Sequence, residues 1–289
     1  MPLSLIWIAD QYPYQQRGQP LGVLFAALAG GIAAGKTLGV LVVPLIGWRG
    51  LFVAIAVASV PLLVLLWPQR RLLSEATAHP GPGLQGLLRV FGRLVGQARG
   101  ASTYGYVLLN SIFHGGVYTW LGVYFQERYG LGEVGIALAI VGYGIPGFVF
   151  GRPIGRLADR WGRRRLLPPG LAIGALSALA LVPEWGFAYA AVVVFMLSFG
   201  FALTQPLFAG IVTDLGGRRL MGQAMGLNVF LLFNGFGVGA LLFGQLLDIG
   251  FTAALLWFAL GELMLAAGAL WFFRRETPQR AAGDDAAKS

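Results

Sequence analysis

The chain alternates between long apolar blocks and short polar connections. The blocks lie at 20–46, 50–67, 103–127, 131–154, 166–183, 187–213, 221–246 and 252–273, with a shorter apolar stretch at 1–9. A helix needs roughly 20 apolar residues to cross the hydrocarbon core of a bilayer. The blocks are apolar on all sides, whereas a surface helix of a soluble domain keeps one polar face. The pattern therefore predicts an all-α membrane protein with about eight transmembrane helices and a partial one at the N-terminus.

Composition and charge support this prediction and orient the chain. Only 11% of the residues are charged, against about 25% in soluble domains. When the connections are assigned alternately to two sides, 18 of the 21 lysines and arginines fall on one side and two on the other. Basic residues favour the cytoplasmic side, so we expect the C-terminus and the connection 155–165 in the cytoplasm, in a bacterial plasma (inner) membrane. The basic residues are spread over five connections without a platform for stacking bases, which argues against nucleic acid as a partner.

An internal repeat links the two ends of the chain at a shift of 204 residues. The matched residues are Asp10, Gly18, Gln19, Gly22, Gly31 and Gly35 in the first copy and Asp214, Gly222, Gln223, Gly226, Gly235 and Gly239 in the second. Glycine is common in this chain, so the Asp and Gln matches carry most of the weight. Repeats of this size are typical of membrane transporters.

The densest charge lies in 151-GRPIGRLADRWGRRRLL-167, which holds six arginines and Asp159. We expect the chain to turn sharply at Gly155 and Gly162, so that Asp159 accepts hydrogen bonds from the N-terminus of a neighbouring helix. Neighbouring arginines, namely Arg156, Arg160, Arg163 and Arg164, are expected to hold this carboxylate by paired hydrogen bonds and to contact anionic lipid headgroups.

The string GRLADRWGRRR resembles the loop motif of the major facilitator superfamily, which lies between the second and third helices of each six-helix half. The resemblance implies that the blocks are helices 5 to 12 of a twelve-helix fold and that 1–9 ends helix 4. It also implies a latch that closes the cytoplasmic face of the outward-open state, with the start of helix 5 near Gln19 to Gly22 as its partner. The implied latch residues are Gly155, Asp159, Arg160, Gly162, Arg163 and Arg164. The alternative is that these charges only fix the topology.

On this resemblance the chain has four parts. Residues 1–67 are the remnant of the N-terminal half, 68–102 a cytoplasmic loop with an amphipathic helix at 84–97, 103–273 the C-terminal six-helix half, and 274–289 a polar tail. The first copy of Asp159 would lie about 45 residues before Met1. We therefore expect a fragment or a misplaced start, with a shortened descendant as the alternative, and no transport by this chain alone.

The segment 31-GIAAGKTLG-39 resembles the glycine motif of helix 5 in antiporters of the family. Gly31, Gly35 and Gly39 match the motif and permit close helix packing, whereas Lys36 stands where the family has proline. A charge at mid-membrane depth is costly unless it is paired or hydrated. Lys36 is therefore a candidate counter-ion for an anionic substrate or a candidate proton-coupled switch, and its structural alternatives are an ion pair with another helix or snorkelling.

Other polar side chains inside apolar blocks are candidates for substrate binding or coupling. Asn110, His114 and Tyr118 recur every four residues and form one helical stripe, which suits either a cavity wall or hydrogen bonds between helices. Glu262 is a candidate for proton coupling or a buried structural acid. Tyr143, Gln205 and Asn234 are further candidates beside the bends expected at Pro146 and Pro206.

These observations predict a secondary active transporter of a small solute that works by alternating access in the lipid bilayer. Proton-coupled efflux is the mode that the partial helix 5 motif favours, with protons as the candidate coupling ion. A sugar or organic-anion carrier, a partner-dependent half-transporter and a non-transporting remnant are the alternatives. The sequence shows no Ser/His/Asp set, metal-spaced cluster or phosphate-binding loop, so we expect no enzyme activity, cofactor or metal.

Overall fold

The computed structural model describes residues 2–69, 83–142 and 144–274, and every regular element in these ranges is helical. The elements are α1 (Pro2–Gln11), η1 (Tyr14–Gln16), α2 (Gly18–Leu66), η2 (Trp67–Gln69), α4 (Leu84–Gly96), α5 (Ala98–Tyr129), α6 (Glu133–Val141), α7 (Ile145–Trp161), α8 (Arg163–Ala180), α9 (Phe187–Leu246), η3 (Leu247–Ile249) and α10 (Phe251–Phe272). The predicted all-α class is confirmed. The predicted polar tail lies outside the described residues beyond Arg274.

Two of the helices are bent into pairs of arms at glycines. α2 bends at Gly47 (φ 70°) and α9 bends at Gly217 (φ 52°). Glycine adopts these positive φ angles without the clash that a β-carbon would make. Gly47 lies between the predicted blocks 20–46 and 50–67, and Gly217 lies between 187–213 and 221–246. The predicted single block 131–154, in contrast, is divided into two helices, α6 and α7.

Five described segments are long and apolar enough to cross a membrane. They are Val42–Leu66, Val134–Trp161, Phe187–Gly217, Leu220–Ile249 and Phe251–Phe272, and the apolar segment Gly18–Gly31 is shorter. The expected count of eight spanning helices is therefore not confirmed. α5 has 32 residues but carries several polar side chains, and α8 has 18 residues of which the first three are arginines; both features lower the mean hydropathy.

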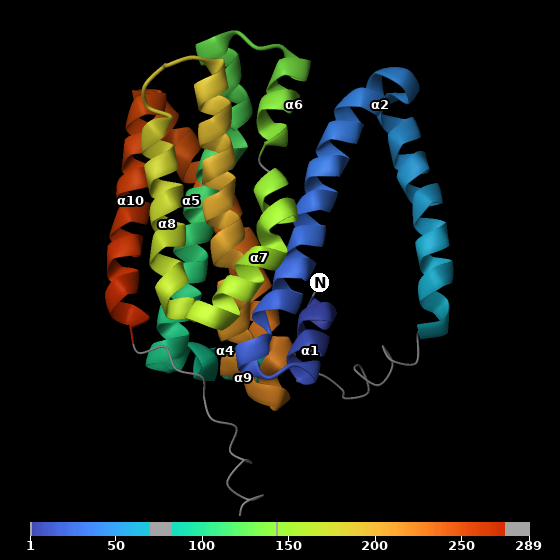
Figure 1. Ribbon diagram of the computed structural model, residues 1–289, viewed down its shortest axis with the longest axis vertical. Helices are drawn as coiled ribbons and strands as arrows, with labels where there is room; N and C mark the ends of the chain where they lie inside the picture. The colour runs from blue at the N-terminus through green and yellow to red at the C-terminus, as the bar shows by residue number, and fades with distance from the viewer. Residues whose placement is uncertain (1, 70–82, 143, 275–289) are drawn as a thin grey trace, which may run out of the picture.

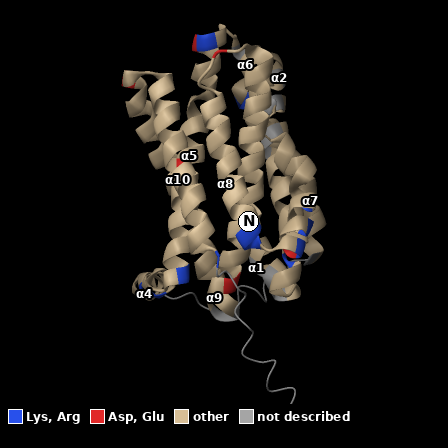
Figure 2. Ribbon diagram, turned by 60° about the vertical axis from the view of Figure 1, so that its left-hand side comes forward, with Lys and Arg blue, Asp and Glu red and all other residues tan. Residues whose placement is uncertain are grey.

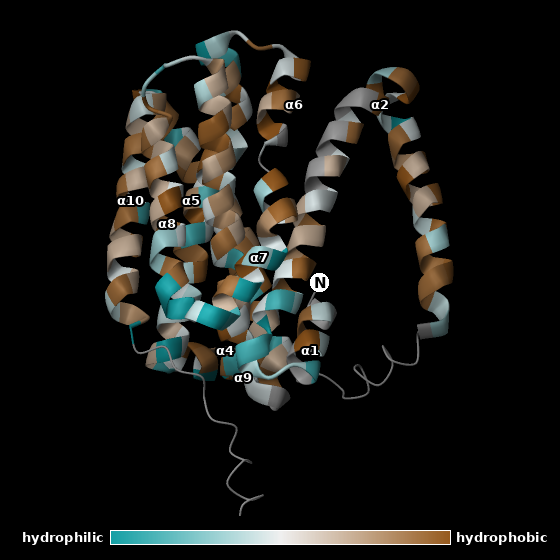
Figure 3. Cartoon of the chain, viewed as in Figure 1, coloured by the Kyte–Doolittle hydropathy of each residue, from teal (hydrophilic) through white to brown (hydrophobic). Residues whose placement is uncertain are grey.

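Figure 1 shows α5, α8, α9 and α10 as a bundle, with the first arm of α2 beside α7 and the second arm of α2 standing apart. Most of the described lysines and arginines gather at one end of the molecule (Figure 2), where hydrophilic segments also gather (Figure 3). We call this end, which holds Gly18, Gly162 and Arg274, the basic end. The far end holds the bend at Gly47 and the turn at Gly250.

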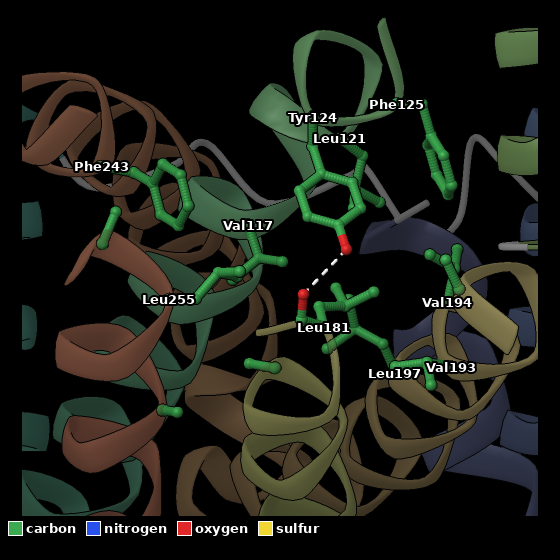
Figure 4. Close-up of a cluster of buried hydrophobic side chains, with 14 of the residues drawn as sticks. Val117, Leu121, Tyr124, Phe125, Leu181, Val193, Val194, Leu197, Phe243 and Leu255 are labelled. Carbon is green, nitrogen blue, oxygen red and sulfur yellow. Dashed lines mark hydrogen bonds between the residues drawn. The ribbon is translucent and has the colours of Figure 1, made fainter. Parts of the chain in front are cut away.

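Buried apolar side chains from α5, α8, α9 and α10 fill the bundle near the far end (Figure 4). Within this core the Tyr124 hydroxyl donates a 2.8 Å hydrogen bond to the carbonyl of Leu181, the residue that follows the end of α8. Arg128 donates to the carbonyls of Leu181 and Val182 and to the hydroxyl of Thr252, at 3.2, 2.9 and 2.9 Å. A cation at a helix C-terminus is favourable because the carbonyls there have no helical partner. Arg128 thus joins the far ends of α5, α8 and α10.

Candidate functional site

Asp159, near the end of α7, contacts the first turn of α2. Its carboxylate accepts hydrogen bonds from the backbone N–H groups of Gly18 (2.7 Å) and Gln19 (3.0 Å). The residue before α2, Arg17, provides no side-chain cap, so the carboxylate serves N–H groups that the helix itself leaves unpaired. A negative charge at this position also interacts favourably with the helix dipole. The contact with the helix start near Gln19, expected from the sequence, is therefore present.

The backbones of α2 and α7 run against each other with only small residues between them. A β-carbon at Gly18 would meet the carbonyl oxygen of Gly155, and one at Gly22 would meet that of Gly151. One turn further, a β-carbon at Gly151 would lie 2.6 Å from the Cβ of Ala26. Small residues four apart allow this close approach of two helices. We call this contact, formed by Gly18, Gly22 and Ala26 with Gly151 and Gly155, the glycine seam.

The seam corrects the sequence-based interpretation of Gly155. We expected a sharp turn there, but α7 continues through Gly155 to Trp161. The chain turns only at Gly162, where φ is 81°. At Gly155 the backbone of Gly18 occupies the space that a side chain would need. A glycine at a close helix contact and a glycine at a turn cannot be told apart from the sequence.

Arg163, the first residue of α8, connects the basic end of the bundle to the segment before α2. Its side chain is buried, its Nη2 donates to the carbonyl of Tyr14 at 3.2 Å, and its guanidinium lies 4.1 Å from the centre of the Tyr14 ring. A cation over an aromatic face contributes about 0.5–2 kcal/mol, depending on its desolvation. A β-carbon at Gly210 of α9 would collide with this guanidinium, so Gly210 leaves room for it.

The expected pairing of several arginines with Asp159 is not found among the described contacts. The hydrogen bonds that Asp159 accepts come from the backbone N–H groups of Gly18 and Gln19, while Arg163 binds Tyr14 and Arg164 donates to the carbonyl of Arg274 at 3.3 Å. Arg156 and Arg160 are exposed. The physical reason is that the backbone N–H groups at the start of α2 already bind the carboxylate, so that Arg163 acts on it only through its charge.

A cavity of about 840 Å³ lies between α1 and the start of α2 and reaches Asp159. Its other walls include Trp7, Tyr12, Gln16 and Gln19. Asp159 is only partly buried, so water has access to the carboxylate from this side.

The glycine motif of the first α2 arm faces open space. A β-carbon at Gly31 or Gly35 would have no neighbouring atom within 4 Å among the described residues. At the repeat-related Gly235, in contrast, the Cβ position lies 2.6 Å from the Cβ of Ser111 in α5. The close packing expected at the motif thus occurs earlier in α2, at the seam. Lys36 lies in the same arm, and its side chain is outside the described part of the structure.

Two members of the polar stripe on α5 are sealed inside the bundle. Asn110 and His114 are fully buried. The Asn110 amide donates to the Thr204 hydroxyl at 3.5 Å, and the His114 Nδ1 lies 2.9 Å from the carbonyl of Asn110. The Oδ1 of Asn110 and the Nε2 of His114 have no hydrogen-bond partner among the described residues. These side chains lie between helices, and Tyr118 is partly buried beside the His114 ring, 5.7 Å away.

The remaining candidates are dispersed. Gln205 and Glu262 are buried, and the Gln205 amide nitrogen and both Glu262 oxygens lack partners among the described residues. Asn234 is exposed and donates to the carbonyl of Phe230 in its own helix at 2.8 Å. Tyr143 lies outside the described residues. The structure does not bring these side chains together around one described cavity.

Sequence reasoning missed the α7 side of the seam. Gly147, Gly151 and Gly155 are spaced four apart, a pattern that indicates a close-packed face of a membrane helix. No comparable sequence pattern marks Tyr14, whose carbonyl accepts the hydrogen bond from Arg163, because Tyr14 lies in the short segment between α1 and α2.

Comparison with known proteins identifies a family and relatives that match most of the chain. The sequence model of the Major Facilitator Superfamily matches residues 1–236 and, in an overlapping second match, residues 136–288. The chloramphenicol resistance protein of Streptomyces lividans is 26% identical over 230 residues, which cover 76% of this chain and 56% of that protein. The uncharacterized MFS-type transporter YwfA of Bacillus subtilis (strain 168) is 25% identical over 225 residues, covering 76% and 53%.

Among solved structures, the human organic anion transporter MFSD10 (TETRAN) is similar to this chain with a TM-score of 0.66 and 15% identity. The match covers 93% of this chain and 67% of that one, and at this identity it concerns the fold alone. The chain spans about half the length of the curated relatives it matches.

Proposed function

This chain belongs to the major facilitator superfamily, and from that premise we propose that it works in secondary active transport of a small solute by alternating access. In this mechanism two halves of a transporter rock about a central site, so that the site opens to one side of the membrane at a time. The mode we propose is proton-coupled efflux. The relative from Streptomyces lividans is named for chloramphenicol resistance, which favours a small organic molecule as the exported solute.

The observation that carries the proposal is the junction between Asp159 and the start of α2. It connects residues 141 positions apart in the chain, on either side of the long connection that the sequence predicts between the two halves. We place the basic end in the cytoplasm because lysines and arginines concentrate there. The junction and the glycine seam then act as a latch that closes the cytoplasmic face.

The contacts of α2 also bear on the conformation. α2 and α7 are in close contact from Gly18 to Gly30, whose β-carbon position meets the Phe148 ring, whereas the β-carbon positions at Gly31 and Gly35 are open. The closed contact at the basic end favours the outward-open member of the proposed cycle. Release of Gly18 and Gln19 by Asp159 would be the first step of inward opening.

A second candidate function is transport of an organic anion or a sugar. Lys36 favours an anion, because a lysine at mid-membrane depth needs a negative partner or water. A partner-dependent half-transporter is the third candidate, since this chain spans only 56% and 53% of its curated relatives.

Deletion of the gene in its own host tests these candidates without any assumption about partners. We expect deletion to raise cellular accumulation of labelled chloramphenicol, and a protonophore to abolish the difference between the strains. Wild-type protein and Asp248→Asn, an exposed acid at the far end, should restore export, whereas Asp159→Asn should not. Unchanged accumulation of the probe would contradict efflux of this compound class, and lowered accumulation would favour the uptake carriers.

A further inference from the structure

The short helix α4 lies across the basic end of the bundle (Figures 1 and 2). It ends at Gly96, the chain turns at Gln97 through an extended conformation (φ −84°, ψ 137°), and α5 begins at Ala98. The spanning segments of α9 and α10, in contrast, run along the length of the bundle. A helix that crosses the ends of spanning helices lies along the membrane surface.

Packing fixes the position of α4 on the bundle. Leu94 is only 3% exposed and belongs to one buried cluster with Tyr104 of α5 and Met225 of α9. A β-carbon at Gly100, in the first turn of α5, would collide with the carbonyl oxygen of Leu94. The two helices therefore meet backbone to backbone at their corner, and the fold determines which sides α4 presents to its surroundings.

The same cluster indicates the depth of α4. Tyr104 lies within one helical turn of Tyr106, whose ring packs 5.0 Å from the ring of Phe273 at the end of α10. The adjacent Trp271 and Phe272 are 65% and 51% exposed. Exposed aromatic side chains at the end of a spanning helix lie at the level of the lipid headgroups. α4 is therefore at the level of the headgroups on the basic side.

One side of α4 is apolar and exposed. Leu84, Leu88 and Val95 are 73%, 60% and 42% exposed, and their spacing of four and seven residues places them in one line along the helix. We call these three residues the α4 stripe. The exposed Arg89 and Arg93 lie roughly 120–160° around the helix from it. α4 contains no acidic residue, so its charged side is entirely basic.

The chemistry of the α4 stripe favours lipid over a protein partner. A specific protein interface carries about one hydrogen bond per 100–200 Å². The side of α4 that holds the stripe, including the partly buried Phe91, has no hydrogen-bonding side chain. Apolar residues on one side and arginines on another are typical of helices that lie in the membrane surface.

We propose that the α4 stripe inserts into the leaflet on the basic side and anchors α4 in the membrane surface. Leu84, Leu88 and Val95 then contact the glycerol and upper acyl region, while Arg89 and Arg93 face the aqueous side of the headgroups. The inference does not depend on the proposed transport activity, on the solute or on the direction of transport.

Site-directed spin labelling of the full chain in lipid nanodiscs tests the proposal, because the chain has no native cysteine. Labels at Leu84→Cys and Leu88→Cys are compared with labels at Arg89→Cys and Arg93→Cys. All four native side chains are exposed, so the variants are expected to fold. Collision rates are measured with oxygen, which concentrates in lipid, and with a water-soluble nickel chelate. We expect oxygen to dominate at the two leucine positions and the chelate to dominate at the two arginine positions.

A second substitution tests whether the residues of the stripe act together. Leu88→Gln should shift the label at Leu84→Cys towards collision with the chelate, because it places a polar group on the inserted side. The matched control is Arg93→Gln, which leaves the stripe intact and should leave the balance of collisions at Leu84→Cys unchanged.

Three results would overturn the proposal. Dominant collision with the chelate at all four labelled positions would place the α4 stripe in water. Low collision rates with both reagents at Leu84→Cys and Leu88→Cys would show that another protein segment covers the stripe. Equal shifts caused by Leu88→Gln and Arg93→Gln would indicate a general loosening of α4 rather than loss of its contact with lipid.

Discussion

The carboxylate of Asp159 lies 2.7 Å from the backbone nitrogen of Gly18, so that a side chain at the end of α7 caps the first turn of α2. The same carboxylate also accepts a 3.0 Å hydrogen bond from the backbone N–H of Gln19, so its charge lies at the helix N-terminus, with Arg163 as a nearby cation. In the proposed latch, closure of the basic end depends on this carboxylate and on two N–H groups of the backbone.

Replacing that charge should shift the molecule towards the state that is open at the basic end. Asp159→Asn keeps an oxygen acceptor but loses the charge, which contributes about 1–2 kcal/mol at a partly buried helix N-terminus. The ratio of closed to open molecules should fall about five- to thirtyfold. Asp248→Asn is the control at the far end and should leave the ratio unchanged.

Spin labels measure this shift cleanly because the chain has no cysteine. One labelled pair, Gln16→Cys with Trp161→Cys, reports the basic end, and a second, Trp48→Cys with Val134→Cys, reports the far end; all four native residues are exposed. In Asp159→Asn we expect longer distances for the first pair and shorter ones for the second. Identical distance distributions in the variant and the parent would rule out a latch at Asp159.

The repeat provides a matched test of the glycine seam. A β-carbon at Gly22 would meet the carbonyl of Gly151, whereas one at the repeat-related Gly226 would have open space. Gly22→Ala should destabilise the closed state by about 1–3 kcal/mol, since the two helices must separate. Gly226→Ala should be neutral or stabilising by up to about 1 kcal/mol, because alanine is the better helix former. Thermal unfolding in detergent and the spin-label pair at the basic end give the comparison, and a similar response of both variants would contradict the seam.

Arg163 is expected to matter more than its neighbours in the arginine cluster. Arg163→Gln removes the contact with the Tyr14 ring and the hydrogen bond to the Tyr14 carbonyl, with an expected cost of about 1–3 kcal/mol. Arg165→Gln, at an exposed position, should cost less than about 0.5 kcal/mol. Limited proteolysis between α1 and α2 measures the difference, with faster cleavage near Tyr14 expected only in Arg163→Gln. Equal cleavage rates would show that the buried arginine does not hold this segment.

At the far end, the hydrogen bonds of Arg128 should outweigh its ion pair. Arg128→Met leaves the Val182 carbonyl without its donor and the Leu181 carbonyl with the Tyr124 hydroxyl alone, and should destabilise the bundle by about 1.5–3 kcal/mol. Its ion pair with Glu184 joins an exposed carboxylate, 60% accessible, at 3.3 Å, and pairs of this kind contribute about 0–1 kcal/mol. Glu184→Gln should therefore change the unfolding temperature little. A larger effect of Glu184→Gln than of Arg128→Met would reverse this ranking.

Glu262 tests whether a buried acid is needed in its charged form. Both of its oxygens are buried without described partners, and an unpaired charge in such a place is very costly. We expect Glu262→Gln, which keeps the shape and adds no charge, to unfold at the same temperature as the parent. A loss of several degrees would show that an ionised carboxylate is paired in the folded protein. Loss of protonophore-sensitive export with unchanged stability would instead assign Glu262 to proton coupling.

The all-helical membrane class was predictable because apolar length is a strong local pattern, although five described segments qualify as spans and not the expected eight. The partner of Asp159 was expected from the resemblance of GRLADRWGRRR to the loop motif of the family, and a helix N-terminus is a favourable partner for a carboxylate. Hydropathy does not show the division of 131–154 into α6 and α7, since both sides of the break are apolar, but the break lies beside Pro146, where a bend was expected. The turn predicted at Gly155 was wrong because the sequence does not distinguish a glycine that permits close helix contact from a glycine that permits a turn.

The polar stripe on α5 shows a further limit of sequence reasoning. A period of four places Asn110 and His114 on one face, but the neighbours of that face decide whether it lines a cavity or packs against another helix. Those neighbours include Thr204 and Phe201 and also glycines of α8 and α9: the Cβ position of Gly174 lies 3.6 Å from the His114 ring, and Gly200 packs on the backbone of Gly174. Their small size brings the helices together and buries the stripe.

The glycine seam also determines what must change when α2 and α7 move. At Gly18, Gly22, Gly151 and Gly155 the two helices touch largely through peptide groups, with Ala26 and Asp159 as the side chains beside them. Few interlocked side chains would therefore have to change rotamer when the helices slide or tilt. In the proposed latch, we expect the two hydrogen bonds to Asp159 to set most of the barrier to this movement.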